Sequence, residues 1–125
     1  RPDTALRMWL NLKKAYNIIG LAQKAGKVSA GTLAAQTSLM RKRACLLVLS
    51  ADISSSTRDS LVSLCKRQKI PWVEFGNKYD LGTSVGKAYR VALTINDPGM
   101  AKAMIDCLDA ARDDTTSTGV VQWPK

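Results

Sequence analysis

The fold of this chain is decided by residues 17–32, which have the sequence NIIGLAQKAGKVSAGT. Apolar residues at mostly helical spacing up to Ala25 predict a helix, and Gly26 stands where a left-handed cap ends one. Residues 27–30 predict a brief extended segment. Gly31 and Thr32 then begin a second helix. The stretch therefore predicts a helix, a strand and a helix in close succession.

The same alternation continues on both sides of this stretch. The first helix is expected over residues 5–25, and the second ends near Lys42. The apolar run at residues 44–50 is typical of a strand buried on both faces. The later elements are expected as a helix at 54–68, a strand at 71–75, a short helix at 78–85, a strand at 90–95 and a helix at 98–111. This order predicts the α/β class, arranged as a three-layer α/β/α sandwich. We expect one domain over residues 1–112 and a flexible polar C-terminal tail over 113–125.

Positive charge is concentrated in the first half of the chain. The net charge is +9, and between Asp3 and Asp52 there are eight lysines and arginines and no acidic residue. Such a stretch cannot neutralise itself, so it favours a polyanion, and nucleic acid in particular, over a small acidic substrate. No apolar run approaches the roughly 20 residues of a membrane-spanning helix, so we expect no membrane partner.

The residues that usually support catalysis are scarce. Histidine is absent, Glu74 is the sole glutamate, and Cys45, Cys65 and Cys107 lie far apart in apolar stretches. We expect these cysteines to be buried thiols in a reducing cytoplasm. The segment at residues 82–87 resembles a phosphate-binding loop, but its glycines are too close and no hydroxyl follows its lysine. We therefore expect no enzyme, no metal and no cofactor.

The start of the second helix is a candidate anion site. Gly31 and Thr32 open it, and Ala35 stands where a reciprocal acidic cap would be, so the terminal amides meet no carboxylate. Lys24 and Lys27 precede it. The alternative is an ordinary helix start in which Thr32 is the cap.

This second helix has two apolar faces. Ala35 and Leu39 share one face, and Leu33, Thr37 and Met40 share the other. If the first pair faces the core, the second face is an exposed apolar stripe; the alternative is a helix covered on both sides. The cations at residues 41–43 are interpreted as a solvated helix end that offsets the dipole.

Several separated motifs resemble one known family. They are the stretch at 17–32, the strand and aspartate at 44–52, Ile70 with Pro71, and the segments at 79–87, 90–95 and 97–101. Together they resemble the kink-turn-binding ribosomal protein family of the L7Ae type, over about residues 12–108. The resemblance implies a four-stranded mixed sheet between helices, and RNA binding as the activity.

The resemblance also implies the residues that contact RNA. One edge of the site is expected at the second helix and the lysines before it, and the other at the loop before the last strand. The expected RNA-binding residues are Lys24, Lys27, Gly31, Thr32, Leu33, Ala34, Thr37, Lys87, Ala88, Tyr89 and Arg90. The implied partner is structured RNA, kink-turn-like and ribosomal, bound by a cytoplasmic, ribosome-associated monomer.

A second function stays open beside the first. In the family the positions of Leu33, Ala34 and Thr37 usually carry polar residues that recognise the sheared G·A pairs of a kink-turn. Loss of these polar residues with a gain of leucine is also expected of a protein-interaction or self-association module that kept the fold. Leu33, Ala34 and Met40 would then form the contact face.

Overall fold

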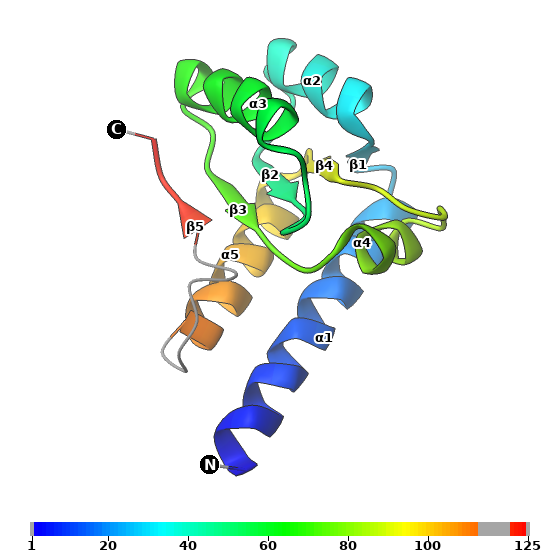
Figure 1. The fold of residues 1–125 in the computed structure, drawn as a ribbon, viewed down its shortest axis with the longest axis vertical. Helices are drawn as coiled ribbons and strands as arrows, with labels where there is room; N and C mark the ends of the chain where they lie inside the picture. Colours follow the sequence, from blue (N-terminus) through cyan, green and yellow to red (C-terminus); the bar gives the residue numbers. More distant parts are fainter. Residues whose placement is uncertain (1, 113–120, 125) are drawn as a thin grey trace.

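The computed structural model describes residues 2–112 and 121–124. Helices and strands alternate along the chain, as expected from the sequence (Figure 1). In chain order the elements are α1 (Pro2–Lys24), β1 (Val28–Ala30), α2 (Thr32–Met40), β2 (Leu46–Leu49), α3 (Ser55–Gln68), β3 (Trp72–Glu74), α4 (Lys78–Ser84), β4 (Ala92–Ile95), α5 (Pro98–Arg112) and β5 (Val121–Gln122).

The strands form one mixed sheet in the order β1-β4-β2-β3-β5. Strands β2 and β3 are parallel, and the other neighbours are antiparallel. Strand β1 lies at one edge and pairs only with β4 among the described strands, through Ser29 opposite Thr94. This edge carries the candidate site, because α2 follows β1 directly.

Helices cover both faces of the sheet and form two separate hydrophobic cores. Leu46 and Val48 of β2 pack on the side of α1, α4 and α5. Leu47 and Leu49 point the opposite way, toward α2 and α3. All four residues of β2 are fully buried, which confirms the prediction of a strand covered on both faces.

The sheet has five strands, so the expectation of four was wrong. The fifth, β5, pairs antiparallel with β3, with Val121 opposite Val73. Val121 is buried, and its pairing satisfies backbone groups at the outer edge of β3. A two-residue strand gives little periodicity in the sequence, and it falls within the stretch predicted as a polar tail. Residues 113–120 of that stretch lie outside the described residues.

None of the helices in the described part of the chain combines the length and hydrophobicity needed to cross a bilayer.

Candidate functional site

The turn between β1 and α2 depends on a glycine. Gly31 has φ +106°, a conformation that L side chains rarely adopt, and it is the N-cap of α2. Its amide donates to the Ala92 carbonyl at 2.8 Å, and its carbonyl accepts from the Ala35 amide at 2.8 Å. Thr32 is the first helical residue, so the alternative in which Thr32 caps the helix was wrong.

The N-terminus of α2 has no side-chain cap. Gly31 offers no side chain, and the first turn holds no acidic residue. The geometry of a helix leaves its first amides without acceptors inside the helix. The amides of Thr32, Leu33 and Ala34 therefore provide partial positive charge at the surface.

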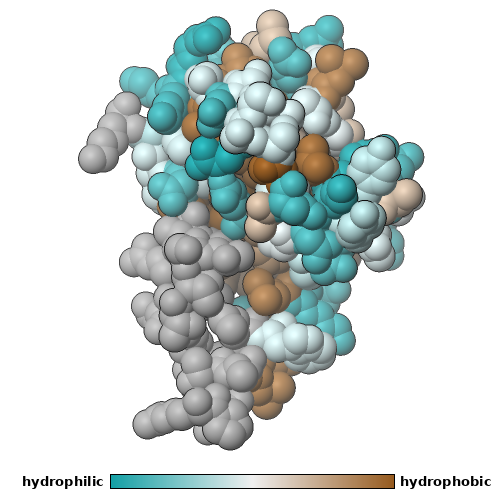
Figure 2. Space-filling model, viewed as in Figure 1, coloured by the Kyte–Doolittle hydropathy of each residue, from teal (hydrophilic) through white to brown (hydrophobic). Residues whose placement is uncertain are grey.

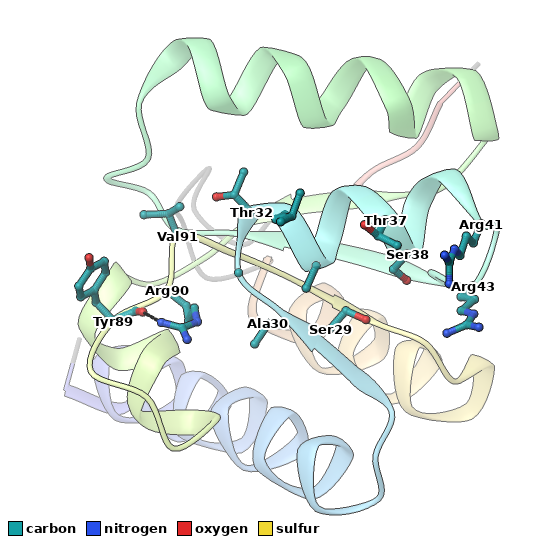
Figure 3. Close-up of a pocket in the computed structure, with 13 residues that line it drawn as sticks. Ser29, Ala30, Thr32, Thr37, Ser38, Arg41, Arg43, Tyr89, Arg90 and Val91 are labelled. Carbon is teal, nitrogen blue, oxygen red and sulfur yellow. Dashed lines mark hydrogen bonds between the residues drawn. The ribbon is translucent and has the colours of Figure 1, made fainter.

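A groove of about 700 Å³ runs beside α2, between this helix, β1 and the residues before β4 (Figure 3). Figure 3 shows Tyr89 and Arg90 at one end and Arg41 and Arg43 at the other. The lining residues are Ser29, Ala30, Gly31, Thr32, Leu33, Ala34, Thr37, Ser38, Arg41, Arg43, Tyr89, Arg90 and Val91. The lining contains three arginines and no acidic residue, so the groove has a positive field along its length.

Arg90 lies against the turn at Gly31. A β-carbon on Gly31 would be 3.6 Å from Nε of Arg90. One guanidinium nitrogen, Nη1, donates to the Tyr89 carbonyl at 2.6 Å, whereas Nε is buried without a hydrogen-bond partner. A buried donor without an acceptor costs stability, so this nitrogen favours an incoming acceptor.

The loop of residues 87–90 is held in place by α4. The Arg90 amide donates to the Lys78 carbonyl at 2.8 Å. A β-carbon on Gly82 would come within 2.5 Å of the Tyr89 Cα, so only glycine allows this close approach. Tyr89 itself is exposed, and the Lys78 ammonium lies 5.3 Å from the Tyr79 ring centroid and 6.0 Å from that of Tyr89. Two aromatic rings thus stand at the loop end of the groove, near a lysine.

A hydrogen-bond network under the groove fixes the position of α2. The Oδ1 atom of Asn96 accepts from the hydroxyls of Ser38 at 2.7 Å and Thr94 at 2.9 Å. The amide nitrogen of the same side chain donates to Ser29 at 2.9 Å. One asparagine therefore ties the C-terminal half of α2 to β1 and β4.

The structure brings together most of the predicted site residues. Seven of the eleven line the groove: Gly31, Thr32, Leu33, Ala34, Thr37, Tyr89 and Arg90. Lys24 instead lines a second hollow between α1 and α4, and Lys27, Lys87 and Ala88 are exposed outside the groove lining. Lys27 is separated from Gly31 by the extended strand β1, which spans about 10 Å. Closeness in sequence to the helix start therefore did not bring Lys24 and Lys27 into the groove.

Sequence reasoning missed Arg41 and Arg43, which were interpreted as a solvated helix end. The chain reverses at Gly31, so α2 runs back along β1 and its C-terminal arginines border the same groove. The run of three cations is visible in the sequence. Only the reversal of the chain at Gly31, however, places Arg41 and Arg43 beside the groove. Ser29 and Ser38 carried no comparable signal.

One apolar face of α2 is buried and the other is exposed, which is the first of the two alternatives predicted for this helix. Ala35 and Leu39 are fully buried against the sheet and α3. Leu33 and Met40 are exposed, with Leu33 at 76%. An apolar stripe therefore lies at the surface beside the positive groove.

The fold and the groove define a small, basic α/β/α domain with a cationic groove between its second helix and an edge strand. The chain belongs to the ribosomal protein L7Ae/L30e/S12e/Gadd45 family, whose sequence model matches residues 13–105. The predicted family is confirmed, and within it the chain is similar to bacterial YlxQ proteins.

Two relatives illustrate the similarity. The RNA-binding protein YlxQ of Bacillus subtilis (strain 168) is 33% identical over 94 residues, which cover 75% of this chain and 94% of the relative. The large ribosomal subunit protein eL8 of Thermoplasma volcanium is 33% identical over 88 residues, 70% of this chain and 73% of the relative. The family and these relatives carry the names of ribosomal and RNA-binding proteins.

Two solved structures share the fold. A protein of unknown function from Bacillus halodurans C superimposes with a TM-score of 0.74 at 27% identity, covering 77% of this chain and 97% of that one. The 15.5kD RNA binding protein of Giardia lamblia superimposes with a TM-score of 0.65 at 18% identity, covering 86% and 90%. The second likeness concerns the fold alone.

Proposed function

We propose that this protein binds structured RNA, with ribosomal RNA as its partner, through the groove beside α2. Two kinds of support point the same way. Relatives at 33% identity are named as an RNA-binding protein and a ribosomal protein. The chain also carries a net charge of +9, with eight cations and no acid between Asp3 and Asp52.

The observation that carries the proposal is the electrostatic character of the groove. Arg41, Arg43 and Arg90 line it without any acidic neighbour in the lining. None of the ion pairs among the described residues involves these arginines. The uncapped amides of α2 and the buried Nε of Arg90 add donors at one end. Guanidinium groups and helix N-termini both bind phosphate, so the groove fits an RNA backbone.

The loop end of the groove suits an unpaired base. Tyr89 is exposed there, with Tyr79 and Lys78 beside it. An aromatic ring stacks on any base, whereas phosphate contacts carry no sequence information. Leu33 and Ala34 offer no side-chain donor or acceptor, and Thr37 offers one hydroxyl. We therefore propose recognition of RNA shape, with fewer base contacts than a kink-turn reader would make.

A binding titration against three RNAs tests this proposal. A kink-turn, the same RNA with its G·A pairs replaced, and ribosomal RNA are compared at two salt concentrations. We expect structured RNA to bind with log affinity falling by roughly 0.7–0.9 per phosphate contact for each log unit of salt. Tighter binding to the intact kink-turn would show that this chain recognises kink-turns. Equal, weak binding to all three, or binding that ignores salt, contradicts the proposal.

The exposed side of α2 favours a second candidate function. Leu33 and Met40 lie at the surface at 76% and 59% exposure, beside the groove. Apolar residues exposed on one face of a helix are one mark of a protein contact. The Leu33→Asp variant separates the two functions. If it disrupts an oligomer or a protein complex while RNA affinity is retained, α2 is a protein-binding face. If RNA affinity falls instead, the stripe belongs to the RNA site.

A further inference from the structure

We propose that the outward face of α1 docks an acidic amphipathic helix of a partner protein. This goes beyond RNA binding and uses a different side of the molecule. Helix α1 packs on the sheet face opposite to α2, because the core residues of the two helices belong to separate clusters. Both surfaces are therefore available at once.

The outward face of α1 carries large apolar side chains that are exposed in the described part of the chain. Leu6, Trp9, Leu10 and Leu21 are each exposed by half or more, whereas Ala15, Ile19 and Ala22 on the other side are fully buried. Figure 2 shows hydrophobic side chains at the surface in the lower part of the molecule, where Figure 1 places the N-terminal half of α1. The spacing of Leu6, Leu10 and Leu21 keeps them on one side of a helix.

The same face alternates these apolar residues with lysines. Lys13 and Lys24 lie three residues beyond Leu10 and Leu21, and all four side chains are exposed. The Lys13 ammonium lies 5.2 Å from the centroid of the Trp9 ring. Helical partners recognise such stripes through apolar residues three and four positions apart, and their acidic residues pair with the lysines.

A hollow of about 570 Å³ between α1 and α4 provides an anchor point on this face. Its lining residues are Tyr16, Asn17, Gly20, Leu21, Lys24, Thr83 and Ser84. The hydroxyls of Thr83 and Ser84 donate to the Tyr79 and Asp80 carbonyls of their own helix, at 2.9 Å and 3.0 Å. These donors are already satisfied, so the hollow suits an apolar side chain at its floor and a carboxylate near Lys24 at its rim.

Charge decides between an acidic partner and a second copy of this chain. A second copy that met this face with its own α1 would present the same lysines and, between Asp3 and Asp52, no acid to pair with them. Lysines buried in an interface without a carboxylate oppose association. An acidic helix neutralises Lys13 and Lys24 while its apolar residues cover Leu10 and Leu21.

Site-specific crosslinking tests the proposal. A photo-crosslinking amino acid is placed at Leu21, and separately at Leu10, in the full chain in cells that make it, and the attached segment is identified by mass spectrometry. We expect both positions to label one protein segment that has apolar residues three or four apart, flanked by Asp and Glu. Lys13→Glu should lower the crosslinking yield by roughly tenfold, because the attraction between Lys13 and an acidic residue of the partner becomes a repulsion. Lys66→Glu on α3 is the matched control and should leave the yield unchanged.

Any other outcome overturns the proposal. Crosslinks to RNA, to lipid, to a second copy of this chain or to many unrelated proteins assign the face to a different occupant. The same holds for a yield that Lys13→Glu does not change, or for no crosslink from either position. RNA affinity of the Lys13→Glu variant is measured in parallel. Because α1 and the groove lie on different sides of the sheet, we expect this affinity to fall by less than threefold. Failure of the α1 proposal is therefore distinguishable from failure of RNA binding.

Discussion

The Nε atom of Arg90 lies 3.6 Å from the position that a β-carbon on Gly31 would occupy, so the loop before β4 lies beside the turn before α2. This contact joins two segments almost sixty residues apart in the sequence into one end of the groove. It combines an uncapped helix N-terminus with a guanidinium group whose Nε has no partner. Both features favour an anion at this point.

Replacing Gly31 with alanine should destabilise the protein. The distance to Arg90 is an ordinary contact, so the cost comes from the backbone, where φ +106° is strained for any L side chain. We expect Gly31→Ala to lower the free energy of unfolding by about 1–2 kcal/mol, measured by urea denaturation. Gly20→Ala is the control, because Gly20 lies within α1 and meets only Ser84 at 3.5 Å. It should stabilise by about 0.5–1 kcal/mol. Equal effects of the two variants would contradict the role given to the Gly31 conformation.

Removing the Asn96 side chain should loosen the groove. Asn96→Ala eliminates hydrogen bonds with Ser38, Thr94 and Ser29 and leaves three hydroxyls without this partner. We expect a loss of about 2–3 kcal/mol in unfolding free energy, near 1 kcal/mol for each bond. Asn17→Ala, an exposed asparagine on α1, should change stability by less than about 0.5 kcal/mol. If both variants unfold at the same urea concentration, the network does not hold α2 in place.

High pH should destabilise the protein through Tyr16. Burial, and secondarily the negative charge of Asp80, raise the pKa of Tyr16 from 10.0 to about 12. The folded state therefore keeps the proton that the unfolded state loses, so stability is full below pH 10 and falls as the pH rises toward 12. The ring also packs on Phe75, with centroids 4.7 Å apart. Tyr16→Phe keeps this packing and should reduce the loss of stability between pH 10 and 12, measured by urea denaturation. An unchanged pH profile would show that Tyr16 titrates normally.

The sequence predicted local structure more accurately than the relations between distant segments. The helix start at Gly31 and the strand within residues 44–50 were found, because each depends on local backbone preference and hydrophobicity. Strand β5 was missed, because two residues are too few to show the alternation of apolar and polar side chains, and because the strand forms only by pairing with β3. Two of the three groove arginines, Arg41 and Arg43, were missed for a similar reason. Whether Arg41 and Arg43 face solvent or a site depends on the reversal at Gly31, which places the end of α2 beside β1.

The salt dependence of RNA binding tests the central claim most directly. The affinity for ribosomal RNA is measured across a salt series for the unchanged protein, for Arg41→Ala/Arg43→Ala, and for Lys66→Ala/Arg67→Ala. The last variant removes two exposed cations from the end of α3 that do not line the groove. If the groove holds RNA phosphates, the Arg41/Arg43 variant loses affinity and its salt slope falls by roughly 1.4–1.8, while the control keeps the slope of the unchanged protein. Equal slopes for all three proteins would contradict RNA binding in the groove.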